Sequence, residues 1–186
     1  MKRRYFLQGT LSALVATSLG KPAFSQSVPS KKAFKVKALE TRYSERITIA
    51  DAPIDFKLLS SDTDDNLSVF ISTNNKKGFG PPLHLHHEMD EFFCVLDGRF
   101  LFQLDEDIVS LVNGDSLFIP RGVKHCFTYN GETSGTLLVG ILPGKGLENY
   151  FAEMGRLLPG EGMPDMKAMQ AVYRKYKSEI VGPPMR

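Results

Sequence analysis

Short segments rich in β-branched and aromatic residues follow one another between residues 67 and 142, and turn residues separate them. The strongest turn signals are Asp97-Gly98 and Asn113-Gly114, two dipeptides that favour tight β-hairpins. We expect strands at residues 67–73, 92–96, 99–104, 108–112, 116–119 and 136–142. Short strands at this spacing predict an all-β fold, either a sandwich or a barrel.

Two segments before residue 65 also have the composition of strands. Ile47-Thr48-Ile49 and Phe56-Lys57-Leu58-Leu59 are rich in apolar residues, and Asp51-Ala52-Pro53 separates them. We expect them to be strands or edge strands of an N-terminal extension, residues 26–64.

The apolar pattern changes after Pro143 from an alternating to a helical period. The residues at helical spacing are Leu147, Tyr150, Phe151, Met154, Leu157 and Leu158, followed by Met166, Met169, Tyr173, Tyr176 and Ile180. They predict a C-terminal helical segment, residues 144–186, whose second helix ends at Gly182-Pro183-Pro184. We expect both helices to pack on the outside of the β domain. A contact between two copies in a homodimer is the alternative.

The composition excludes several classes of protein. A chain of 186 residues suits one domain, and its net charge of +2 has no basic or acidic block that would indicate nucleic-acid binding. Two cysteines, Cys94 and Cys126, are too few for a disulfide scaffold. We expect both to be free thiols, although an exported protein can form a disulfide.

Residues 1–25 have the pattern of an export signal. Lys2-Arg3-Arg4 precedes an apolar run at residues 11–19 that is too short to span a membrane. Ala23-Phe24-Ser25 has the small residues of a cleavage site, and the paired arginines resemble a twin-arginine signal. We therefore expect a periplasmic or exported protein with no membrane span in its mature form. An ordinary secretory signal or an uncleaved anchor is the alternative.

One stretch concentrates residues that bind metals. His84 and His86 are two residues apart, so on a strand both imidazoles point to the same face. Glu91 follows at a distance that allows the chain to turn back, and His125 offers a third imidazole. Imidazole and carboxylate groups together are a ligand set for first-row transition metals.

The spacing around these residues resembles the two motifs of the cupin family. Gly78, His84, His86, Glu91 and Gly98 match the first motif, and the second is matched by Gly114, Pro120, Gly122 and His125. The resemblance implies a double-stranded β-helix, or jelly-roll barrel, over residues 65–143. It also implies His84, His86, Glu91 and His125 as ligands of one divalent metal, with Fe, Mn, Ni, Co, Cu and Zn all possible. Glu88 and Asp90 could replace Glu91, but the family spacing selects Glu91. The family's usual asparagine after the second motif is replaced by Tyr129.

The chain also resembles the single-domain cupins that are similar to quercetin dioxygenases. The resemblance implies a metal-dependent dioxygenase in which Glu91 takes the hydroxyl proton of a small phenolic or enolic substrate. A phenylalanine-rich interior would suit such a substrate, although these side chains can equally fill a small barrel; the candidates are Phe93, Phe100, Phe102, Phe118 and Phe127. A non-catalytic periplasmic protein that binds a metal or small ligand is one alternative. A metal-assisted isomerase, decarboxylase or lyase is another.

Overall fold

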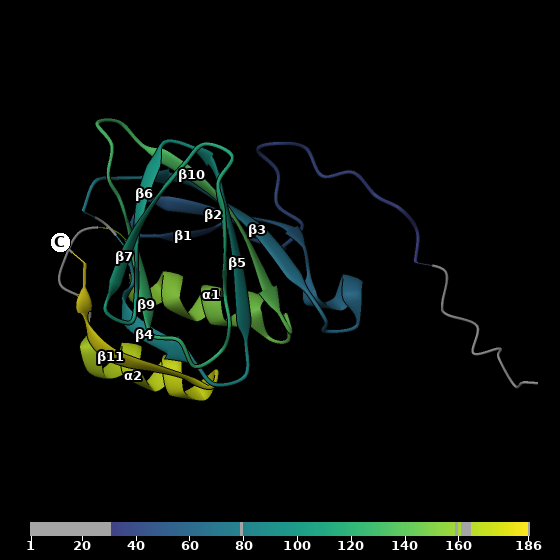
Figure 1. Cartoon of the computed structure of the whole chain (residues 1–186). Helices are drawn as coiled ribbons and strands as arrows, with labels where there is room; N and C mark the ends of the chain where they lie inside the picture. Colours follow the sequence, from purple (N-terminus) through teal and green to yellow (C-terminus); the bar gives the residue numbers. More distant parts are fainter. Residues whose placement is uncertain (1–30, 79, 159, 161–164, 186) are drawn as a thin grey trace, which may run out of the picture. The chain divides into compact units, whose positions relative to one another are not determined.

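The computed structural model describes residues 31–78, 80–158, 160 and 165–185 (Figure 1). The predicted signal, residues 1–25, lies outside this part of the chain. All the elements described below belong to one compact unit that begins at Ala33. No helix among the described residues is long and apolar enough to cross a membrane.

Two antiparallel sheets build the domain, as the all-β prediction requires. One has six strands in the order β1 (Ile47–Ile49), β2 (Ala52–Leu58), β3 (Ser68–Asn75), β10 (Gly135–Leu142), β5 (Asp90–Asp97) and β8 (Ser116–Ile119). The other has five, in the order β11 (Ser178–Pro184), β4 (Pro82–His86), β9 (His125–Tyr129), β6 (Arg99–Leu104) and β7 (Asp107–Val112). The remaining elements are a short 3₁₀ helix, η1 (Ser60–Thr63), and two helices, α1 (Leu147–Leu157) and α2 (Met166–Lys175).

The hydrophobic core lies between the inner faces of the two sheets. Phe93 of β5 packs edge-on against Phe102 of β6, with ring centroids 5.0 Å apart. Both rings and that of Phe100 are buried, because alternate residues of each strand point inward. On α1, Phe151 continues this core, with its ring centroid 4.7 Å from that of Phe70. The helical stripe of α1 is therefore part of the core, as its spacing predicts.

The two glycine turns connect the sheets and do not close hairpins, so our hairpin prediction was wrong. Gly98 joins β5 to β6, and Gly114 joins β7 to β8. In both cases the two strands belong to different sheets, so they do not pair with each other. Both glycines have a positive φ, +91° and +90°, which allows the chain to turn sharply from one sheet to the other. The hairpin of this region is β6–β7, whose two-residue turn is Asp105-Glu106.

Strand β2 begins earlier than the sequence suggests. It starts at Ala52 and includes Pro53, which we had placed in a separating loop. Pro53 pairs only with Thr48 of β1, because the pairing of β2 with β3 begins at Ile54. A proline, which has no backbone N–H to donate, is tolerated at a position where one side of the strand has no neighbouring strand.

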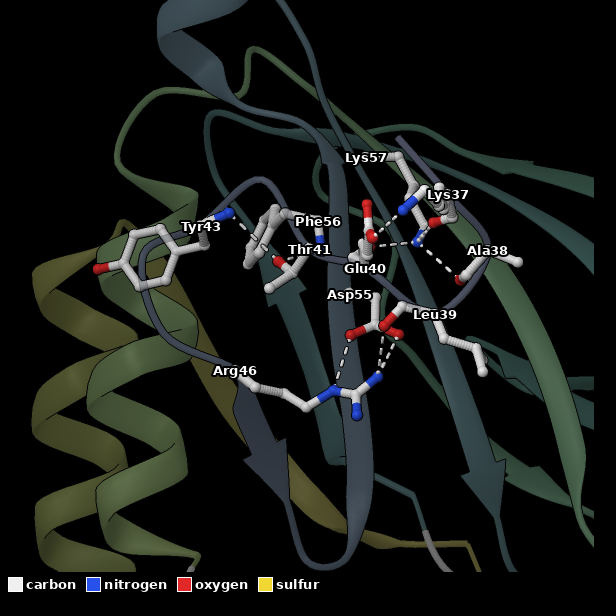
Figure 2. Close-up of polar contacts among 10 residues, drawn as sticks. All are labelled: Lys37, Ala38, Leu39, Glu40, Thr41, Tyr43, Arg46, Asp55, Phe56 and Lys57. Atoms are coloured by element: carbon white, nitrogen blue, oxygen red, sulfur yellow. Dashed lines mark hydrogen bonds and ion pairs between the residues drawn. The ribbon is translucent and has the colours of Figure 1, made fainter. Parts of the chain in front are cut away.

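The segment that precedes β1 is fastened to β2 (Figure 2). The ammonium group of Lys57 donates hydrogen bonds to the backbone carbonyls of Lys37, Ala38 and Glu40. Thr41 accepts a hydrogen bond from the backbone N–H of Phe56, at 3.1 Å. These contacts cover the edge of β2 beyond the end of β1, so the N-terminal extension takes part in the sheet.

The second helix is shorter than predicted, and a strand follows it. Asp165 caps α2 by accepting hydrogen bonds from the backbone of Lys167 and Ala168. The helix ends at Lys175, and Lys177 has a left-handed φ of +57° that turns the chain. Residues 178–184 then pair with β4 as β11, so Ile180 and Gly182-Pro183-Pro184 are in a strand and not in a helix. Pairing with β11 satisfies the backbone groups of β4 that would otherwise form an open sheet edge.

Candidate metal centre

Four side chains that could bind a metal converge at one end of the barrel. Strand β4 carries His84 and His86, β5 carries Glu91, and β9 carries His125, which is directly opposite His84 in the β4–β9 pair. One ligand atom from each of the four lies within 4.8 Å of every other, and all four residues are buried. The structure thus brings together the four residues that the sequence predicts as ligands.

The backbone around the cluster is held by a second set of contacts. Asp90, next to Glu91, accepts hydrogen bonds from the backbone N–H and the guanidinium of Arg121 at 2.8–3.0 Å. The hydrogen bonds to Arg121 lower the pKa of Asp90 to about 2, so this carboxylate stays charged. The next residue, Gly122, donates its N–H to the carbonyl of His86. These bonds fasten the turn before His125 to the strands that carry the other candidate ligands.

Each imidazole is oriented by a hydrogen bond on the ring nitrogen away from the cluster. The Nδ1 atom of His84 is 2.8 Å from the carbonyl oxygen of Pro82, and Nδ1 of His125 is 3.0 Å from that of Val123. A carbonyl oxygen can only accept, so both Nδ1 atoms carry the proton. The Nε2 atom of each neutral ring then has a lone pair directed into the cluster, as a metal ligand requires.

The atoms that face one another in the cluster lack partners. Among the described residues, Nε2 of His86, Oε2 of Glu91 and Nε2 of His125 are buried without a hydrogen bond of acceptable geometry. Nε2 of His125 is nevertheless 2.7 Å from Oε2 of Glu91. Two electron-rich atoms at this distance repel each other unless a proton or a metal cation lies between them. The three nitrogen and one oxygen donors therefore fit a transition-metal ion, without selecting among Fe, Mn, Ni, Co, Cu and Zn.

The electrostatics of the cluster favour a neutral His84 and a charged Glu91. Burial, followed by the proximity of His125 and His86, lowers the pKa of His84 to about 3, so its lone pair is available at neutral pH. Burial opposes ionisation of Glu91, but the interactions with His86 and His125 hold its pKa well below the usual range. Burial likewise opposes protonation of His125, but the negative charge of Glu91 raises its pKa.

The other candidates from the sequence lie away from the cluster. His87 is exposed and pairs with Glu179 at 3.7 Å, and Asp90 is occupied by Arg121, so neither replaces a predicted ligand. Glu88 is also exposed. Cys94 and Cys126 are free thiols, as predicted, and burial raises the pKa of Cys126. The phenylalanines mostly fill the barrel, and Phe118, at 58% exposure, lies on its outer surface.

Three residues near the cluster were not found from the sequence. Ser178 of β11 contacts Nδ1 of His86 at 2.6 Å, and the ring of Tyr173 lies edge-on to that of His84, with centroids 5.4 Å apart. The ring of Tyr150 in turn lies edge-on to that of Tyr173, with centroids 5.8 Å apart. Burial, with the charge of Glu91, raises the pKa of Tyr173 to about 12, so its phenol stays protonated. The helical stripe indicated that both tyrosines are buried, but no local pattern linked them or Ser178 to the histidines.

Comparison with known proteins agrees with this geometry. Residues 72–141 match the family model of the cupin domain. Over 90 residues the chain is 29% identical to quercetin 2,3-dioxygenase of Bacillus subtilis (strain 168), which covers 48% of this chain and 26% of that protein. The chain thus spans about a quarter of the length of this curated relative.

Two solved structures resemble part of the chain. KdgF from Halomonas sp. is 16% identical, with 52% of this chain and 84% of that one covered and a TM-score of 0.46. An uncharacterised conserved protein with a double-stranded β-helix domain from Klebsiella pneumoniae subsp. pneumoniae MGH 78578 is 15% identical, with 61% and 91% covered and a TM-score of 0.45. The match of residues 72–141 to the cupin domain model agrees with the two antiparallel sheets and the four converging side chains of the structure.

Proposed function

We propose that the chain is a metal-dependent, dioxygenase-like enzyme that acts on a small phenolic or enolic substrate. The observation that carries the proposal is the buried cluster of three imidazoles and one carboxylate, whose ring nitrogens are oriented inward. The 29% identity to quercetin 2,3-dioxygenase supports this chemistry over the others that a cupin domain can host. A redox-active divalent metal would supply Lewis acidity toward a substrate oxygen and a path for electrons to dioxygen.

The residues of the chain would then divide the remaining tasks. His84, His86 and His125 would hold the metal through Nε2, with their orientation fixed by the partners of Nδ1. Glu91 would hold the metal and accept the proton of a substrate hydroxyl as that oxygen approaches. The protonated phenols of Tyr150 and Tyr173 would offer hydrogen-bond donors from the helices, beside His84. Burial of the four candidate ligands and of Tyr173 would keep bulk water from the reacting atoms.

Oxygen uptake by the metal-loaded protein tests this function. With Fe²⁺, Mn²⁺ or Ni²⁺ bound, we expect consumption of dioxygen that depends on a flavonol or a simpler enolic compound. Glu91→Gln should reduce the rate about 100-fold or more, because the proton acceptor is lost. The matched control is His87→Ala, which removes an exposed imidazole outside the cluster and should leave the rate unchanged.

The other outcomes assign the protein to a different class. Turnover of the same compounds under nitrogen would contradict the oxygenase and favour an isomerase, decarboxylase or lyase. Tight binding with no turnover in either gas would favour a non-catalytic binding protein. Oxygen uptake that persists in the variant His125→Ala arises from metal in solution and not from metal in the site.

We also propose that the protein is exported through the twin-arginine route on the signal in residues 1–25. This route carries folded proteins, so the metal could be loaded before the chain meets copper or zinc outside, which most nitrogen-rich sites bind more tightly.

Changing Arg3 and Arg4 together to lysine is expected to abolish export, because the twin-arginine signal requires the paired guanidinium groups. Cell fractionation and immunoblotting would measure the protein in the periplasm, with Lys2→Arg as the control that keeps the charge and the pair. Undiminished export of the double variant would show that an ordinary secretory signal is at work.

A further inference from the structure

The C-terminal segment, defined as α2 and β11, lies outside the matched cupin domain but contacts the candidate metal centre twice. Tyr173 of α2 packs against the ring of His84, and Ser178 of β11 lies directly opposite His86 in the β11–β4 pair. Figure 1 shows α2 and β11 together beside β4. Both contacting side chains are 2% exposed, so this part of the chain closes the site from solvent.

The contact between Ser178 and His86 differs in kind from those of the other two histidines. His84 and His125 are each oriented by a carbonyl two residues away on the same chain segment. The partner of His86 is a side-chain hydroxyl 92 residues away, and only the pairing of β11 with β4 brings it there. His86 is therefore the one candidate ligand among the three whose orientation depends on a distant element.

A chain of hydrogen bonds selects the form of His86 that can bind a metal. The Ser178 hydroxyl donates to the backbone carbonyl of Tyr176 at 3.3 Å, so its oxygen is free to accept from Nδ1–H of His86 at 2.6 Å. With the proton on Nδ1, the lone pair of Nε2 faces the cluster. Without Ser178, the tautomer protonated on Nε2 would be favoured, because Oε1 of Glu91 lies 3.3 Å from Nε2 and can accept a hydrogen bond from it.

We propose that Ser178 is a positioning residue that holds His86 in its metal-binding tautomer, so that the affinity for metal depends on the C-terminal segment. This inference rests on the metal site of the proposed function, but not on any catalytic activity. Outer partners of metal-bound histidines fix the tautomer and the ring orientation, and their loss typically costs about 10–100-fold in affinity. The hydroxyl of Ser178 is in a position to fix the tautomer and the ring orientation of His86.

Titration of the full, metal-free chain with Co²⁺ tests the proposal, followed by visible absorption and by competition with a chelator. We expect Ser178→Ala to bind Co²⁺ about 10–100-fold more weakly than the wild type. Glu179→Ala is the matched control on the same strand, since the side chain of Glu179 is exposed and forms an ion pair with exposed His87, away from the cluster. The affinity of this variant should equal that of the wild type. Equal affinities of Ser178→Ala and the wild type would overturn the inference.

A second measurement uses the wild type and so does not depend on the folding of a variant. Nitrogen-15 NMR of the metal-free protein reports which ring nitrogen of His86 carries the proton, and we expect Nδ1. A proton on Nε2 of His86 would overturn the inference while leaving the metal site intact. Failure of the wild type to bind Co²⁺ would instead overturn the proposed function, and this inference with it.

Discussion

Replacing His125 with alanine is expected to reduce the bound metal from about one equivalent to none. The expected loss of metal affinity is about 100-fold or more, because a ligand is removed; loss of a residue that only hydrogen-bonds to a ligand typically costs about 10–100-fold. The remaining donors would be two imidazoles of one strand and a carboxylate, which leave the side of the ion facing β9 open. Elemental analysis of the purified full chain, with His84→Ala beside it, measures this. His87→Ala is the control, because it removes a histidine of the same segment whose side chain is exposed.

The metal-free fold is expected to survive this change. His125 lies outside the hydrophobic core between the sheets, so the truncation leaves that packing in place. Circular dichroism should therefore show the same β structure for the wild type and for His125→Ala after chelation. Full metal content in His125→Ala or in His84→Ala would contradict the four-ligand site.

The sequence predicts the cluster well because the relevant information is local. On a strand, His84 and His86 must share a face, and their position relative to Glu91 is limited by one turn. His125 lies further along the chain, and only the resemblance to the second cupin motif placed it with the others. All four residues do converge, and the pairing of β4 with β9 sets His125 opposite His84.

Features that depend on distant pairing could not be predicted in this way. Ser178 reaches His86 only through the β11–β4 ladder, and residues 176–180 fit a helical period as well as a strand. The turn at Asp97-Gly98 has the sequence of a hairpin, and its φ is positive as expected. Whether the chain then pairs with the strand it has left or crosses to the other sheet depends on the closure of the whole barrel, which no dipeptide determines.

Phe102 offers a test of whether the aromatic interior serves the fold or a substrate. Its ring is fully buried, with centroids 5.0 Å from Phe93 and 5.4 Å from Phe127. Truncation to alanine removes these contacts and leaves a cavity in a close-packed core, which typically costs about 3–5 kcal/mol. We expect urea unfolding of the metal-free Phe102→Ala protein to show a loss of stability of this size.

The control is Phe118→Ala, because Phe118 is also a strand phenylalanine but is 58% exposed. Its truncation should change the free energy of unfolding by about 0.5 kcal/mol or less. A residue that lined a preformed substrate cavity would behave differently from both, since its packing would be incomplete before the substrate binds. If Phe102→Ala unfolded like the wild type but bound the substrate more weakly, the barrel interior would have to be hollow at this position. The edge-on packing of Phe102 against Phe93 instead predicts that its main effect is on stability.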